Sequence, residues 1–183
     1  MKKRKSILIG ATAILLFGAI AIVSELTGGN VPNNGAAPTS ALVGHRVKDF
    51  SIGGLNGGTT RAPWESGRAS VLVFFASYCV PCQGEMPKIA AYIRVHNPDP
   101  VEVLAVDAID ERGAAQAMIR KDDVTFPVAF DPNGAVTTGV FGFGQVPESV
   151  FVSSKGIVER VFYGAIPKQQ LATGIKMLKA LNS

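Results

Sequence analysis

The chain of 183 residues has few cysteines and no excess of either charge over most of its length. It contains two cysteines, two histidines and one tryptophan. Two cysteines exclude a framework of several structural disulfides. The 18 basic and 14 acidic residues give a net charge of +4, and four of the basic residues lie within the first five positions. The remainder is therefore neutral, and it contains no basic patch interleaved with aromatic residues, which argues against a nucleic-acid surface.

Long apolar runs are scarce as well, and the longest lies at the N-terminus. Residues 2–5 are all basic, and residues 7–23 after them are apolar apart from Thr12 and small residues. This run is short for a bilayer span but longer than most signal-peptide cores. We expect residues 1–23 to be an uncleaved membrane anchor, with a cleaved signal as the alternative. The basic cluster would stay cytoplasmic, which predicts a single-pass protein of the inner membrane with its domain in the periplasm.

The region after this run predicts a tether and then one domain. Residues 24–40 are rich in glycine, proline and asparagine and show no apolar periodicity, which is typical of a flexible linker. Residues 41–183 are sufficient for a single domain with its own core.

Within this domain, the pattern changes from alternating strands and helices to an antiparallel hairpin. Residues 71–76 and 101–106 are continuous apolar runs, typical of strands buried on both faces. Helical patterns follow each of them, which implies parallel strands joined by helical crossovers. Further predicted elements are an N-terminal hairpin over 50–58, a short strand over 126–130, a hairpin of 149–152 with 157–163, and a helix over 167–181. The fold class is therefore α/β, with a mixed central sheet flanked by helices.

The two cysteines form the motif Cys79-Val80-Pro81-Cys82, placed where the strand gives way to a helix of about 80–95. A helix N-terminus presents unpaired N–H groups and a partial positive charge. A cysteine there ionises more easily, and its thiolate is the species that attacks a disulfide. The motif predicts a redox-active pair with Cys79 as nucleophile and Cys82 as resolving thiol. Pro87 is expected to kink this helix or to reset its start.

Two segments then resemble the thioredoxin fold, and in particular the extracytoplasmic cytochrome c biogenesis reductases DsbE or CcmG, with the related TlpA and ResA proteins. The first is residues 74–87, FFASYCVPCQGEMP, which is similar to the active-site signature of that group. The second is residues 140–152, VFGFGQVPESVFV, which is similar to its signature around a cis-proline, here Pro147. The resemblance covers roughly residues 43–181. It implies a thioredoxin-like domain at 41–183, with the predicted hairpin as an N-terminal extension.

The resemblance also suggests further site residues. Pro147 joins the cysteines in the catalytic set, and Tyr78, Val146, Pro147 and Glu148 would bind substrate. The group usually has tryptophan at the position of Tyr78 and glycine at that of Gln145. Cytoplasmic thioredoxins carry a buried aspartate where this chain has Val73, so Glu85 becomes the candidate for proton handling. Alternatively, Glu85 is a solvated acid in the first turn of the helix, where it would stabilise the helix dipole, and Glu148 is an exposed edge residue.

The predicted function is a thiol–disulfide oxidoreductase that acts as a reductant without a soluble cofactor or metal. The resemblance implies apocytochrome c as the client and a transmembrane carrier of the DsbD or CcdA type as the electron donor. A general oxidant like DsbA remains an alternative, because sequence does not fix the redox direction. A copper-binding module that uses two thiolates and a histidine is a second alternative, although neither His45 nor His96 lies far downstream of the cysteines as in known carriers of this fold.

Overall fold

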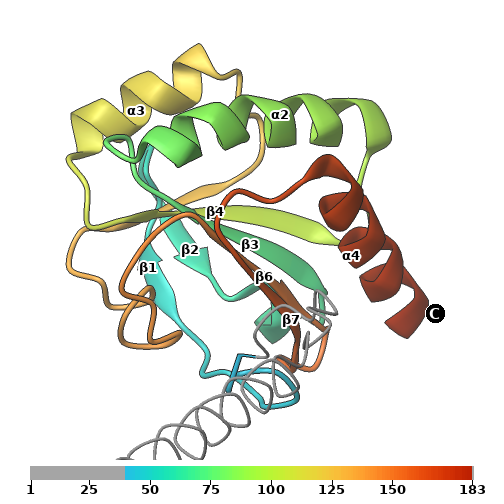
Figure 1. Ribbon diagram of the computed structural model, residues 1–183. Coiled ribbons are helices and arrows are strands. Elements are labelled where there is room, and N and C mark those ends of the chain that lie inside the picture. Colours follow the sequence, from blue (N-terminus) through green and yellow to red (C-terminus); the bar gives the residue numbers. More distant parts are fainter. Residues whose placement is uncertain (1–39, 183) are drawn as a thin grey trace, which may run out of the picture. The chain divides into compact units, whose positions relative to one another are not determined.

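The computed structural model describes residues 40–182, and its strands and helices follow the order expected from the sequence (Figure 1). The elements are β1 (Ser51–Gly53), β2 (Thr59–Arg61), the 3-10 helix η1 (Pro63–Ser66), β3 (Ser70–Phe75), α2 (Val80–His96), β4 (Glu102–Ala108), α3 (Arg112–Lys121), β5 (Val128–Asp131), β6 (Glu148–Val152), β7 (Val158–Tyr163) and α4 (Lys168–Leu181).

A mixed five-stranded sheet of order β5-β4-β3-β6-β7 forms the centre of the fold. β3, β4 and β5 run parallel, whereas β6 pairs antiparallel with β3 and with β7. The helices α2 and α3 provide the crossovers between the parallel strands, because such strands need long connections. The separate β1–β2 hairpin is also present. The fold is thioredoxin-like, as predicted.

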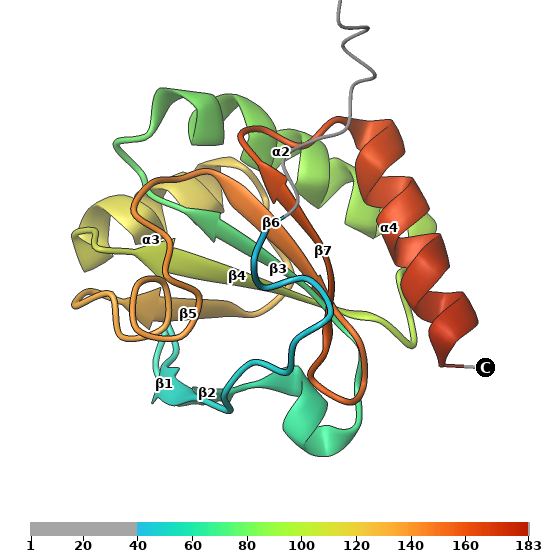
Figure 2. The same ribbon diagram turned by 60° about the horizontal axis from the view of Figure 1, so that its bottom comes forward.

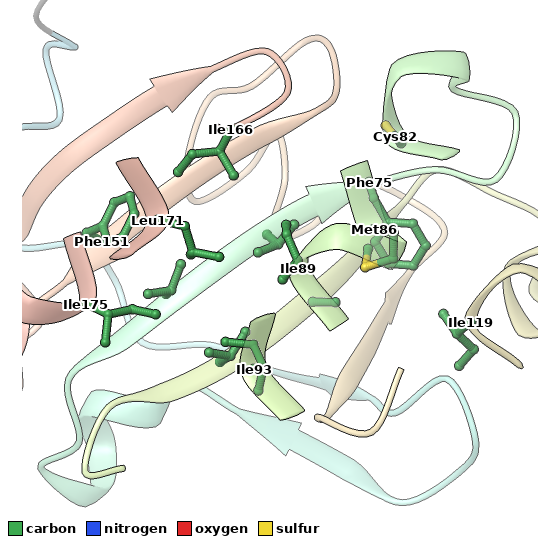
Figure 3. Packing of buried hydrophobic residues seen from close by; sticks show 14 of the residues in the cluster. Phe75, Cys82, Met86, Ile89, Ile93, Ile119, Phe151, Ile166, Leu171 and Ile175 are labelled. Carbon is green, nitrogen blue, oxygen red and sulfur yellow. The ribbon is translucent and has the colours of Figure 1, made fainter. Parts of the chain in front are cut away.

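The face of the sheet that carries Val71, Val73 and Phe75 packs against α2, α3 and α4. Figure 3 shows how Met86, Ile89 and Ile93 of α2 meet the sheet, with Leu171 and Ile175 of α4 beside Phe151 of β6. Cys82 belongs to this same cluster. Burial of this apolar face therefore fixes the helix that carries the cysteine motif onto the middle of the sheet.

The opposite face is covered mainly by loops and the N-terminal part of the domain (Figure 2). Phe50 and Trp64 pack there edge to face, as do Phe74 and Phe143. The chain near Val43 and Arg46 forms bridges to β7 and its adjoining turn. The segment between β5 and β6 thus supplies aromatic side chains to this core and ends at the cis-proline loop.

Two local expectations differ from the structure. Pro87 does not reset the start of α2, since the helix begins at Val80 and continues through Pro87 to His96. Glu85 was expected in the first helical turn, but the start at Val80 puts it in the second turn, and no acid occupies the first.

The expected location in the inner membrane, with a periplasmic domain, is corrected by the structure. No helix within residues 40–182 is both long enough and apolar enough to cross a membrane. The segments predicted as anchor or signal (1–23) and as linker (24–40) lie outside the described residues, except for Ser40.

Candidate active site

Cys79 and Cys82 form a disulfide at the N-terminus of α2, with their Cα atoms 5.2 Å apart. Cys79 is the N-cap residue, and its Sγ accepts a hydrogen bond from the Cys82 N–H at 3.2 Å. The side chain of Cys79 is 8% exposed and that of Cys82 is fully buried. A negative charge on Cys79 would be stabilised by the helix N-terminus and by this N–H group. The geometry therefore suits Cys79 as the attacking sulfur and Cys82 as the inner one.

The loop that leads into the motif is held by a carboxylate from the neighbouring strand connection. Asp110, just after β4, accepts hydrogen bonds from the backbone N–H and from the hydroxyl of Ser77. The carbonyl of Ser77 accepts a further bond from the Gln83 side chain at 2.7 Å. Ser77 is thus fixed from both sides, and it positions Tyr78 and Cys79 directly after it.

The loop before β6 faces the sulfurs. The Val146–Pro147 peptide is cis, as predicted, and the Val146 carbonyl oxygen lies 3.6 Å from the Cys79 Sγ. Tyr78, on the other side of Cys79, is 65% exposed. A small recess beside them is lined by Tyr78, Gln145 and Val146 among other residues. The structure therefore brings together three of the four predicted substrate-binding residues around Cys79.

Glu85 is a buried acid on the same helix as the cysteines. It lies three residues after Cys82, so both side chains project from one face of α2. Its side chain is 2% exposed, and its Oε1 accepts a hydrogen bond from the Ile166 N–H at 2.5 Å. Burial raises the pKa of Glu85 to about 7, although the Ile166 hydrogen bond and the Lys88 charge oppose this shift. Glu85 is therefore an internal acid that titrates near neutral pH, and not a solvated one.

Glu148 is also buried, but it lies on the other face of the sheet. It is the first residue of β6, is 3% exposed, and belongs to the side on which Val150 and Val152 pack. Its Oε2 has no hydrogen-bond partner among the described residues. Burial raises the pKa of Glu148 to about 7. The alternative of an exposed edge residue is wrong for this side chain.

Sequence reasoning missed a third buried acid, Asp107. It lies on β4 opposite Phe75 of β3 and is fully buried, and neither of its carboxyl oxygens has a hydrogen-bond partner of normal geometry among residues 40–182. Side chains alternate between the two faces of the sheet along β4, so Asp107 lies on the same face as Val103 and Ala105. The helices cover this face. Burial, followed by the negative charge of Asp110, raises the pKa of Asp107 to about 8.

A signal for Asp107 did exist in the sequence. It directly follows the apolar run 101–106, and the carboxyl ends of parallel strands meet at one edge of a sheet. The cysteine motif follows the neighbouring strand at that edge. Val73, where cytoplasmic thioredoxins carry their aspartate, pairs with Ala105, two residues before Asp107 on the adjoining strand. On the side of the sheet that the helices cover, Asp107 is thus an acid close to Val73, although Val73 itself is apolar.

The two histidines lie away from this arrangement. His45 and His96 are both exposed, and His96 stacks on Tyr92 at the far end of α2. Within residues 40–182, no group of three or more histidine, cysteine or acidic side chains is arranged to hold a metal ion.

Comparison with known proteins agrees with this geometry. Residues 43–161 match the AhpC/TSA family. The thiol-disulfide oxidoreductase ResA of Geobacillus kaustophilus (strain HTA426) is 26% identical over 179 residues, which is 98% of this chain and 99% of that protein.

Two solved structures share the fold and part of the sequence. DsbF from MTB is 28% identical with a TM-score of 0.64, over 76% of this chain and 98% of DsbF. A protein described as thiol:disulfide interchange protein DsbE from Chlorobium tepidum is 27% identical with a TM-score of 0.64, over 76% of this chain and 97% of that one. The chain therefore belongs to the AhpC/TSA family, among the thioredoxin-like thiol–disulfide oxidoreductases represented by ResA and DsbE.

Proposed function

We propose that the protein works as a reductant of disulfides in client proteins, with Cys79 as the nucleophile. The observation that carries this proposal is the difference between the two sulfurs. Cys79 caps α2 and reaches the surface beside Val146, whereas Cys82 is enclosed by the core. A client disulfide can approach only the first of them, and the second is placed to complete the exchange.

The reaction proceeds in two exchanges that move two electrons to the client. The Cys79 thiolate attacks one client sulfur, a mixed disulfide forms, and the other client sulfur leaves as a thiolate. Cys82, after losing its proton, attacks Cys79, which forms the Cys79–Cys82 disulfide and releases the second client thiolate. Protons are needed on the client sulfurs and must leave Cys82. Glu85, which faces the same way as Cys82 and has a pKa of about 7, is the group that we assign to this transfer.

The clients that we propose are apocytochromes c, whose haem-attachment cysteines must be reduced. The support is the similarity to ResA and DsbE and the resemblance of the two signature segments to that group. A membrane electron donor of the DsbD or CcdA type would return the Cys79–Cys82 pair to the dithiol. Tyr78, Val146 and Pro147 are the proposed contacts for the client chain next to Cys79.

A trapping experiment tests the nucleophile and the clients together. In cells, Cys82→Ser is expected to accumulate mixed disulfides that include apocytochrome c, because the unresolved Cys79 stays bonded to its client. Cys79→Ser is the matched control and is expected to capture nothing. Captured proteins are identified after non-reducing electrophoresis. The absence of any adduct with Cys82→Ser would contradict the exchange, and adducts without apocytochrome c would contradict the client.

The redox potential separates the reductant from a general oxidant. Equilibration with glutathione is expected to give a potential at or below roughly −200 mV, whereas a DsbA-like oxidant has a value near about −120 mV. A value near the latter would reverse the proposed direction of electron flow while leaving the exchange chemistry intact.

A further inference from the structure

A cavity of about 570 Å³ lies behind the cis-proline loop, on the face of the sheet opposite α2. The rings of Phe141, Phe143 and Tyr163 and the buried acid Glu148 line it, together with Gln145. Gln145 also lines the small recess that contains Tyr78 and Val146. The loop before Pro147 therefore separates two spaces: one next to the sulfurs and one next to Glu148.

The position of this cavity relative to Cys79 follows from the chain itself. Val146 approaches the Cys79 Sγ through its carbonyl oxygen, and Glu148 comes two residues later. Phe143, Gly144 and Gln145 belong to the walls of both spaces. A polypeptide whose disulfide lies at Cys79 and which passes over Val146 thus reaches the cavity within a few residues.

The residues that line the cavity determine which kind of client side chain it can bind. No lysine, arginine or histidine lines the cavity within residues 40–182, and Glu148 and Tyr163 are the titratable groups there. An acidic side chain would meet the Glu148 carboxylate with like charge. An apolar side chain would offer no hydrogen bond to the carboxyl group of Glu148, and a buried carboxyl group without a partner costs free energy. A cationic side chain would form a charge-assisted hydrogen bond with Glu148. It would also form cation–π interactions with the faces of the aromatic rings.

We infer that this cavity is a side-chain pocket for the client polypeptide and that it receives an arginine or lysine a few residues from the client's disulfide. The inference rests on the proposed function, since it names the kind of disulfide-bearing chain that this site selects. Glu148 is the specificity residue, because among residues 40–182 its carboxylate supplies the only negative charge in the lining of the pocket. Phe143 and Gln145 connect the pocket to the recess at the sulfurs.

The test uses peptides with one disulfide and an arginine at one to four residues on either side of it. In matched peptides, glutamine or glutamate replaces the arginine. The rate of their reduction by the reduced protein is measured, and so is the Kd of alkylated versions for the oxidised protein. At pH 8 the wild-type protein is expected to prefer the best arginine peptide over its glutamine partner roughly tenfold in both readouts. The preference is expected to shrink towards pH 6, because Glu148 has a pKa of about 7.

Two variants make the result specific. Glu148→Gln, which keeps the shape of the side chain, is expected to abolish the preference for arginine. Glu159→Gln, which removes an acid of β7 that does not line the cavity, is expected to retain it. Circular dichroism shows whether each variant is folded; if Glu148→Gln is not, the pH dependence in wild-type protein decides.

The experiment distinguishes failure of the pocket proposal from failure of the proposed function. Equal Kd values and equal rates for arginine and glutamine peptides would overturn the pocket while leaving the reductant intact. A preference in Kd without reduction of any peptide would overturn the proposed function and leave the pocket standing.

Discussion

At the scale of single residues, the acids that the fold buries matter most for chemistry, and Glu85 is the one nearest to Cys82 in sequence. Its ionisation above about pH 7 places a negative charge on the side of α2 that also carries Cys82. Such a charge disfavours formation of a thiolate nearby. The titrations of the thiols and of Glu85 are then coupled and belong to the cluster.

Glu85→Gln is therefore expected to shift the pH dependence of Cys79 alkylation to lower pH. It is also expected to slow the reduction of client disulfides by at least about tenfold, because proton transfer by a positioned group contributes roughly 10²–10⁴-fold. The measurement is the rate of alkylation and of peptide reduction between pH 5 and pH 9. Glu65→Gln, in η1 and outside the site, serves as control. Superimposable curves for Glu85→Gln and wild type would reduce Glu85 to a structural acid.

At the scale of elements, the packing of α4 supports the position of the active-site helix. Gly174 of α4 faces the ring of Phe151 so closely that a Cβ atom there would lie 2.1 Å from the Phe151 Cε1. Ile166, which donates its N–H to Glu85, comes just before α4. A shift of α4 would thus change both the core and the surroundings of Glu85.

Gly174→Ala is expected to lower the free energy of unfolding by about 1–3 kcal/mol through overpacking. The matched control is Gly113→Ala in α3, where the new Cβ meets no atom within 4 Å. That change is expected to raise the free energy of unfolding by about 0.5–1 kcal/mol, because glycine is unfavourable within a helix. Urea denaturation of the oxidised protein measures both values. A stabilising effect of Gly174→Ala would mean that α4 does not press on Phe151.

At the scale of the whole molecule, the three buried acids with raised pKa values, Glu85, Asp107 and Glu148, make the stability depend on pH. Burial raises the pKa of Glu85 and Glu148 to about 7 and that of Asp107 to about 8, whereas the unfolded chain has ordinary values. Between about pH 4 and pH 8 the folded protein therefore holds protons that the unfolded chain has lost. Stability falls with rising pH wherever the folded state binds more protons. The contribution is fully present below pH 4 and is lost by about pH 8.

The oxidised protein is accordingly expected to be less stable at pH 8 than at pH 5, by about 2 kcal/mol or more. Asp107→Asn is expected to reduce this slope and to be more stable than wild type at pH 8, where the wild-type protein contains a buried charge. Urea denaturation at four pH values measures the slope, and the disulfide keeps the cysteines from titrating. An increase in stability from pH 5 to pH 8 would contradict the assignment of these three acids.

The elements and the cysteine pair were predictable because they depend on local pattern. Apolar runs near 71–76 and 101–106 specify buried strands at any position in a fold, and a helical pattern after each specifies a crossover. The placement of Cys79 and Cys82 at the start of a helix follows from the same local signals. The cis-proline was expected from the resemblance of residues 140–152 to a known signature.

The burial and the pKa values of the acids were not predictable from local pattern, because they depend on which elements pack together. Glu85 becomes internal because the chain before α4 brings Ile166 onto α2. Ile166 lies 81 positions after Glu85 in the sequence. Asp107 becomes buried because helices cover its face of β4, and Glu148 because an aromatic loop covers the other face. The local periodicity of a sequence predicts on which face of a strand or helix a side chain lies. Its burial and the resulting pKa depend on residues that are distant in the sequence.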